Sequence, residues 1–141
     1  MASGSKVPGQ HVARVFSQGD RSAPREARAA VAALTGIDER ARHDLLIVVS
    51  ELVANAVRHA PHVPTGEILL TVAREAEALR VEVRDPGYGF DPSPGPRSEG
   101  GLGLRIVERI ARDWGIVGGG RTLVWCEIGL TPEGGPSRSS P

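Results

Sequence analysis

The chain has 141 residues, and its 17 basic and 17 acidic side chains give a formal net charge of zero. This balance argues against a protein that binds nucleic acid through a basic surface. One cysteine excludes an internal disulfide, and the single lysine, Lys6, leaves no lysine for a Walker A loop. The first ten residues do not resemble a signal peptide, and no apolar run is long enough for a membrane span. We therefore expect a cytoplasmic protein without membrane contact.

The first half of the chain is predicted to form one strand and two helices. Residues 11–16 alternate weakly and favour an edge strand. Residues 24–34 have apolar positions at helical spacing, with proline in the first turn and Gly36 as the stop. Asp38 can cap a second, longer helix over residues 39–60.

The second half is predicted to alternate strands with one more helix. Residues 68–73 are apolar at nearly every position, which predicts a strand buried mostly on both faces. Apolar and charged residues alternate over residues 79–84, which predicts a strand with one solvent-exposed face. The short link 75–78 indicates a hairpin. The remaining predicted elements are a helix over residues 102–113 and strands over 114–117 and 122–130.

Composition marks both ends of the chain and one internal loop as irregular. We expect a disordered N-terminal segment over residues 1–10, a single folded domain over 11–130 and a disordered C-terminal tail over 131–141. The segment 85–101 is rich in Gly and Pro and has almost no aliphatic residue. So long an irregular loop inside a small domain is usually functional or disordered.

Two polar residues of the long predicted helix lie one turn apart. Glu51 and Asn55 have i, i+4 spacing and line one edge of the apolar face. A carboxylate and an amide at this spacing offer oxygen ligands to a Mg²⁺ ion that keeps its water molecules. The alternative is an ordinary, partly solvated helix edge.

Two glycine-containing segments could bind an exocyclic amine and phosphates, respectively. Asp85 ends a predicted strand and opens Asp85-Pro86-Gly87-Tyr88-Gly89. A buried carboxylate there could accept a hydrogen bond from an exocyclic amine, beside glycines that allow a flat ligand to approach. Residues 100–104 open the last predicted helix, whose free N–H groups can hold phosphates without a lysine. The alternative for the first segment is a plain turn, and the alternative for the second is a flexible hinge into the helix.

Together these segments closely resemble the Bergerat-type (GHKL) ATP-binding fold of gyrase B and histidine kinases. Residues 51–59 resemble its N box, residues 85–89 its G1 box and residues 101–104 its G2 box. Residues 118–122 are similar to the Gly/Thr element before the last strand, and the resemblance spans residues 11–130. In its short length and in the segment ELVANAVRHA, the chain resembles the bacterial anti-sigma-factor serine kinases in particular.

The resemblance implies an α/β two-layer sandwich, with a mixed, mainly antiparallel sheet and helices on one face. It implies ATP and Mg²⁺ as cofactors, with Glu51 as the catalytic base and Asn55 as the metal ligand. Asp85 would contact the adenine amine, and Thr122 would support that contact. The other residues implied to bind nucleotide, by shaping the adenine pocket or presenting N–H groups to phosphates, are Gly87, Gly89, Gly101, Leu102, Gly103 and Leu104.

The same resemblance implies a function. Members of this branch form homodimers, sequester a sigma factor and phosphorylate a serine of an anti-sigma antagonist, without direct contact to nucleic acid. One alternative is a catalytically weak nucleotide-binding or purely protein-binding module. Glu99 favours it, because some kinases of the branch carry an arginine just before the glycines. A second alternative, a detached histidine-kinase ATPase domain, is disfavoured because no helical hairpin with a phospho-accepting histidine precedes the domain in this sequence.

Overall fold

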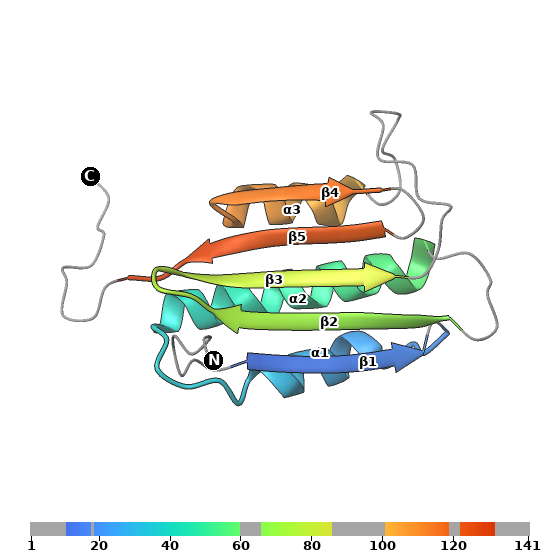
Figure 1. Cartoon of the computed structure of the whole chain (residues 1–141), viewed down its shortest axis with the longest axis horizontal. Coiled ribbons are helices and arrows are strands. Elements are labelled where there is room, and N and C mark those ends of the chain that lie inside the picture. The colour runs from blue at the N-terminus through green and yellow to red at the C-terminus, as the bar shows by residue number, and fades with distance from the viewer. Residues whose placement is uncertain (1–10, 18, 60–65, 86–100, 119–121, 132–141) are drawn as a thin grey trace, which may run out of the picture.

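A computed structural model of the chain describes residues 11–17, 19–59, 66–85, 101–118 and 122–131. These residues form one sheet, and their helices lie in a single layer behind it (Figure 1). The two-layer α/β sandwich with helices on one face is therefore confirmed. None of the described helices combines the length and the apolar character needed to cross a membrane. In chain order the elements are β1 (His11–Ser17), α1 (Ala23–Val31), α2 (Glu39–His59), β2 (Glu67–Arg74), β3 (Ala78–Asp85), α3 (Gly101–Ile110), β4 (Asp113–Val117) and β5 (Thr122–Gly129).

The sheet has the strand order β1-β2-β3-β5-β4, and each neighbouring pair is antiparallel. The predicted edge position of β1 and the mainly antiparallel sheet are confirmed, and the described strands contain no parallel neighbours. Because β3 and β4 are both antiparallel to β5, they run parallel to each other with β5 between them. The last strand of the described residues therefore inserts between two strands that precede it in the sequence.

α2 is the central helix of the second layer. The Ala41 N–H donates to Asp38 Oδ2 at 3.1 Å, so Asp38 caps this helix as predicted. Its apolar residues contact β2, β3 and β5, and these buried residues are Ala41, Leu45, Val48, Val49, Leu52, Val53 and Ala56. On another side, Arg28 Nη1 of α1 donates to Ser50 Oγ at 2.8 Å. α2 is thus covered on more than one side, with α1 and α3 both in contact with it.

One face of β2 differs from the prediction. Ile68, Leu70 and Val72 are fully buried against the helices, but Leu69 is 36% exposed. The predicted burial on both faces is wrong because the described helices cover only one side of the sheet (Figure 1). By contrast, residues 79–84 of β3 have the predicted alternation: the apolar side chains in this stretch face the helices, and the charged ones face away.

Two helices end earlier than the sequence predicts. α1 ends at Val31, where the Leu34 N–H donates to the Val31 carbonyl at 3.0 Å and turns the chain so that Leu34 is buried. Gly36 follows with a φ of 76°, so it serves the connection to α2 rather than the helix end. α3 ends at Ile110 because β4 already begins at Asp113 and pairs with β5.

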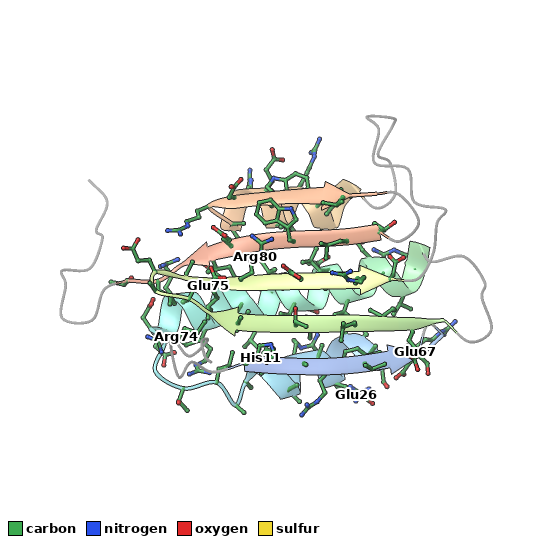
Figure 2. The ribbon with its side chains drawn as sticks, in the orientation of Figure 1. His11, Glu26, Glu67, Arg74, Glu75 and Arg80 are labelled. Atoms are coloured by element: carbon green, nitrogen blue, oxygen red, sulfur yellow. The ribbon has the colours of Figure 1, made fainter. Side chains whose placement is uncertain are left out.

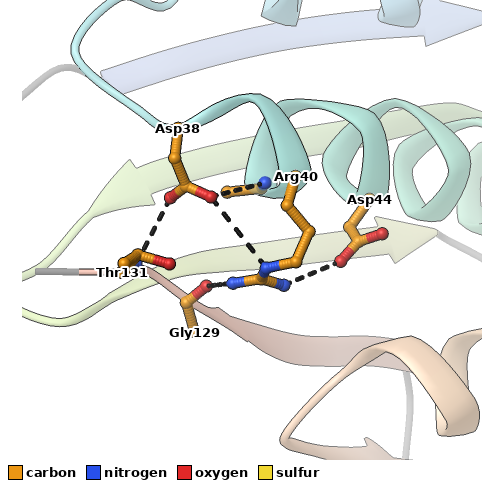
Figure 3. A network of polar contacts seen from close by, with 6 residues as sticks. Asp38, Arg40, Asp44, Gly129 and Thr131 are labelled. Carbon is orange, nitrogen blue, oxygen red and sulfur yellow. Dashed lines mark hydrogen bonds and ion pairs between the residues drawn. The ribbon is translucent and has the colours of Figure 1, made fainter. Parts of the chain in front are cut away.

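A polar network ties the beginning of α2 to the end of β5 (Figure 3). The Thr131 N–H donates to Asp38 Oδ1 at 3.3 Å. Arg40 Nη2 donates to the Gly129 carbonyl at 3.0 Å, and its Nη1 donates to Asp44 Oδ2 at 3.0 Å. Thr131, the first residue of the predicted tail, is held by this network, and the rest of that segment lies outside the described residues.

Replacing Asp38 by alanine is expected to lower the free energy of unfolding by about 1–2 kcal/mol at pH 7, the usual cost of losing a helix cap. Burial of the Asp38 carboxyl acts to raise its pKa, but the N–H donors of Thr131 and Ala41 outweigh burial, so the pKa lies below its ordinary value of 3.8. A lowered pKa in the folded state stabilises the protein above the unfolded-state pKa, and this contribution is lost as the pH falls. Urea unfolding should show a difference between variant and wild type that shrinks below about pH 4.

Asp44→Ala is the matched control. It removes a carboxylate that pairs with the same Arg40 but caps no helix. We expect a loss of about 0.5 kcal/mol or less, because an i, i+4 surface pair contributes little. An equal loss for both variants, or a loss for Asp38→Ala that does not change with pH, would contradict the capping role.

Candidate functional site

The polar residues singled out in the sequence gather at one end of the sheet. β3 ends there with Asp85, and β5 begins there with Thr122. The last turn of α2, which ends at His59, and the first turn of α3, which begins at Gly101, lie at the same end (Figure 1). α2 also contacts β3, β5 and α3 directly. The fold thus brings three of the predicted sequence boxes to one place.

Asp85 and Thr122 form the most specific feature of this end. They are register partners across β3 and β5. Asp85 is 8% exposed and Thr122 is 2% exposed, and no other polar side chain among the described residues is buried. Both alternate with core residues of their strands, so both face the helix layer. A carboxylate is rarely buried without a specific role, and such positions are candidates for functional sites.

Glu51 and Asn55 lie one turn apart on α2, and both are half-buried. Asn55 Oδ1, the atom predicted to bind metal, accepts a hydrogen bond from Arg58 Nη2 at 2.8 Å. Arg58 was not predicted from the sequence to contact this site. Its i, i+3 spacing from Asn55 is the signal that could have identified this contact.

The side-chain oxygens at this position suit a cation that also keeps water or phosphate ligands. Within the described part of the chain, no group of three or more His, Cys, Asp or Glu residues could hold a metal ion. Glu51 and Asn55 offer one carboxylate and one amide oxygen from adjacent turns, too few to complete an octahedron. Mg²⁺ typically takes one or two protein oxygens and completes its octahedron with phosphates and water. The site therefore suits Mg²⁺ bound together with a phosphate ligand.

The beginning of α3 supplies backbone donors near the same end. The helix starts at Gly101 and runs for 10 residues, so its first N–H groups have no partner within the helix. The dipole of such a helix favours an anion at this end. Leu104 is half-buried and packs against the core, so its side chain anchors the helix. Of the remaining predicted nucleotide-binding residues, only the backbone of residues 101–103 is described, and Gly87 and Gly89 lie outside the described residues.

The one cysteine takes no part in this chemistry. Cys126 lies on the helix-facing side of β5 and is fully buried. Burial raises the pKa of the Cys126 thiol to about 12. Because the thiolate is the nucleophilic form, this residue is inert at neutral pH.

Comparison with known proteins defines the class to which this fold and site belong. Residues 19–126 match the family described as histidine kinase-like ATPase domain. The match covers most of the chain, and the chain therefore belongs to this family, whose domain implies ATP binding.

The curated relatives with significant similarity include a sensor histidine kinase of Mycobacterium tuberculosis, PdtaS, from strains CDC 1551 / Oshkosh and ATCC 25618 / H37Rv. In each strain it is 35% identical to this chain over 68 residues. The aligned region is 47% of this chain but only 14% of that protein. The similarity thus concerns a small part of the sensor kinase.

Proposed function

We propose that the chain binds ATP together with Mg²⁺ at the end of the sheet where Asp85 and Thr122 meet. The observation that carries the proposal is this buried carboxylate–hydroxyl pair, set in register on β3 and β5. The Asp85 carboxylate would accept the hydrogen bond of the adenine amine, and the Thr122 hydroxyl would hold the carboxylate in place. Membership of the histidine kinase-like ATPase family supports the same ligand.

The same proposal assigns roles on the helix side of the site. Asn55 would hold Mg²⁺ through Oδ1, and the first N–H groups of α3 would contact the phosphates. Bound Mg²⁺ neutralises the charge that develops on the phosphates during transfer. Glu51 would accept the proton of a serine hydroxyl while that oxygen bonds to the terminal phosphorus and ADP leaves with the bridging oxygen. The chain would therefore act as a serine/threonine protein kinase.

We further propose the regulatory setting implied by the resemblance in sequence. The protein would sequester a sigma factor in the cytoplasm, and its substrate would be a serine of an anti-sigma antagonist. Direct contact with nucleic acid is not part of this proposal, since the net charge of the chain is zero. Binding of a non-hydrolysable ATP analogue, measured by calorimetry with and without Mg²⁺, tests the nucleotide site before any partner is known. Saturable, Mg²⁺-dependent binding is expected, and no binding at millimolar analogue would overturn the proposal.

A histidine-kinase type of transfer is the second candidate, because the relative from Mycobacterium tuberculosis is a sensor histidine kinase. The two candidates differ in the bond that is formed. Phosphoserine survives acid, whereas phosphohistidine is hydrolysed by acid and survives base. Incubation with labelled ATP and either a serine-bearing or a histidine-bearing acceptor therefore separates them. Nucleotide binding without transfer to either acceptor would favour a regulatory binding module.

Replacing Asp85 by asparagine is expected to lower the preference for ATP over GTP by about 10- to 100-fold, the usual value of a hydrogen bond to a charged group. The new amide can donate to the keto oxygen of guanine, whereas the carboxylate can only accept. Competition of both nucleotides against a fluorescent ATP analogue measures the ratio. Thr122→Ser, which keeps the hydroxyl, should retain the preference for ATP. An unchanged ratio in Asp85→Asn would remove Asp85 from the adenine contact.

A further inference from the structure

The guanidinium of Arg58 lies on the oxygen that the proposed function assigns to Mg²⁺. Its Nη2 atom donates to Asn55 Oδ1 at 2.8 Å. Glu51, Asn55 and Arg58 share one side of α2, because these positions fall within about 60° of one another at 3.6 residues per turn. A carboxylate, an amide and a guanidinium thus follow one another toward the last turn of the helix. The effect of this row on metal binding depends on the charge of Arg58.

That charge has no acidic partner in the described part of the chain. The Arg58 side chain is exposed, and none of the ion pairs between described residues includes it. Arg80, which is labelled in Figure 2, provides the contrast. It contacts the carboxylates of Glu82 at 3.1 Å and Glu127 at 3.2 Å, and its guanidinium lies 4.3 Å from the centroid of the Trp125 ring. Arg58 instead donates to a neutral amide oxygen.

A metal ion on the same oxygen would lie close to this guanidinium. Mg²⁺ binds an oxygen ligand at about 2.0–2.1 Å. Because Arg58 Nη2 is 2.8 Å from Asn55 Oδ1, the metal could be no farther than about 5 Å from this nitrogen. The two positive charges repel each other at that distance. Water molecules on the metal would not relieve the repulsion, because metal-bound water donates hydrogen bonds and a guanidinium accepts none.

We propose that Arg58 competes with Mg²⁺ for Asn55 Oδ1, so that the guanidinium leaves this oxygen when Mg²⁺ binds with the nucleotide. The inference rests on the proposed function, because it takes Oδ1 as the metal ligand. The exposed side chain of Arg58 can turn into solvent, so its departure needs no change in the backbone of α2. Before the metal binds, the same hydrogen bond holds the Asn55 amide with its oxygen toward a cation.

Competition of this kind lowers the affinity for the metal without preventing its binding. The guanidinium carries one delocalised charge, whereas Mg²⁺ carries two charges and arrives with negatively charged phosphates. A monovalent ion has no such advantage over Arg58. The arginine therefore gives the site a preference for a divalent ion that is already bound to phosphate.

Neutralising Arg58 tests the competition by calorimetry of the ATP analogue, with saturating Mg²⁺ and without metal. Arg58→Gln removes the charge but keeps a side chain that can donate to Oδ1. This variant should bind the Mg²⁺ complex of the analogue about three- to tenfold more tightly than wild type, because a like charge beside the metal has gone. Its affinity for the metal-free analogue should not rise. Arg58→Lys keeps the charge and should restore the wild-type affinity.

Arg42→Gln is the matched control on the same helix. Arg42 also donates to a neutral oxygen, the Ala32 carbonyl, at 3.1 Å. It lies about 24 Å from Arg58 along the axis of α2, at 1.5 Å per residue. This distance exceeds the screening length of about 8 Å at physiological salt. Both affinities of Arg42→Gln should therefore equal those of wild type.

An Asn55→Ala background separates competition for one oxygen from a general effect of charge. The shared oxygen is absent there, so adding Arg58→Gln should give no gain in affinity for the Mg²⁺ complex. An equal gain in both backgrounds would overturn the proposal.

The remaining outcomes distinguish this inference from the proposed function. A wild type whose affinity for the analogue does not depend on Mg²⁺ would overturn both. If wild type does depend on Mg²⁺, unchanged binding of the Mg²⁺ complex by Arg58→Gln would overturn the competition alone. Weaker binding of that complex by Arg58→Gln would also overturn it, since this is the result expected of an arginine that contacts the phosphates.

Discussion

Glu51→Gln is expected to lower the rate of phosphoryl transfer by about 10²- to 10⁴-fold, the range that a general base contributes. The amide keeps the size of the side chain but cannot accept the proton of a serine hydroxyl. Glu51 is half-buried on α2, one turn before Asn55, so the substitution should leave the core intact. The affinity for the ATP analogue should change by no more than a few fold. Single-turnover transfer with labelled ATP and calorimetry of the same variant measure the two quantities.

Glu77→Gln provides the control for this chemical change. Glu77 is exposed in the hairpin between β2 and β3, at the opposite end of β3 from Asp85. The same change there should leave both transfer and binding at wild-type values. If Glu51→Gln transferred phosphate as fast as wild type, Glu51 would not be the base.

Asn55→Ala is expected to weaken Mg²⁺-dependent ATP binding by more than about 100-fold, since even groups that only support metal ligands contribute 10- to 100-fold to metal affinity. The described part of the chain offers no cluster of acidic or histidine side chains that could replace the lost oxygen. Calorimetry of the ATP analogue, with and without Mg²⁺, should show that the weak residual binding no longer depends on the metal.

Arg58→Ala is the control that distinguishes loss of the metal ligand Asn55 from loss of its hydrogen bond with Arg58. Asn55→Ala removes both Oδ1 and the 2.8 Å bond that this atom accepts from Arg58, whereas Arg58→Ala removes only the bond. The Arg58 variant should therefore keep a clear difference in affinity between Mg²⁺ and no Mg²⁺. Retention of that difference in Asn55→Ala would exclude Asn55 as the ligand.

The elements that sequence analysis predicted well are those with one clear periodicity. The apolar stripe of α2 and the strict alternation of β3 each allow one orientation toward a core, and both orientations were confirmed. The cap at Asp38 was predicted correctly because an aspartate directly before an apolar helical stripe is typical of a helix N-terminus.

Features that depend on distant parts of the chain were not predicted. Leu69 has apolar neighbours on both sides, so local pattern alone cannot show that the sheet has a second layer on only one face. The register between Asp85 and Thr122 depends on β5 entering beside β3 rather than at the edge. The resemblance implied that both residues serve one ligand, but the geometry that unites them follows only from the strand order.

The position of β5 has a consequence for synthesis on the ribosome. Chain emerging before this strand contains β3 with an unpaired edge and β4 without its described neighbour, because β5 pairs with both. It also contains Asp85 without its register partner, because Thr122 is the first residue of β5. Domains generally fold as units during synthesis. A nascent or truncated chain that lacks β5 would therefore have neither a closed sheet nor the buried carboxylate–hydroxyl pair, so ligand capture could begin only once nearly the whole domain has been made.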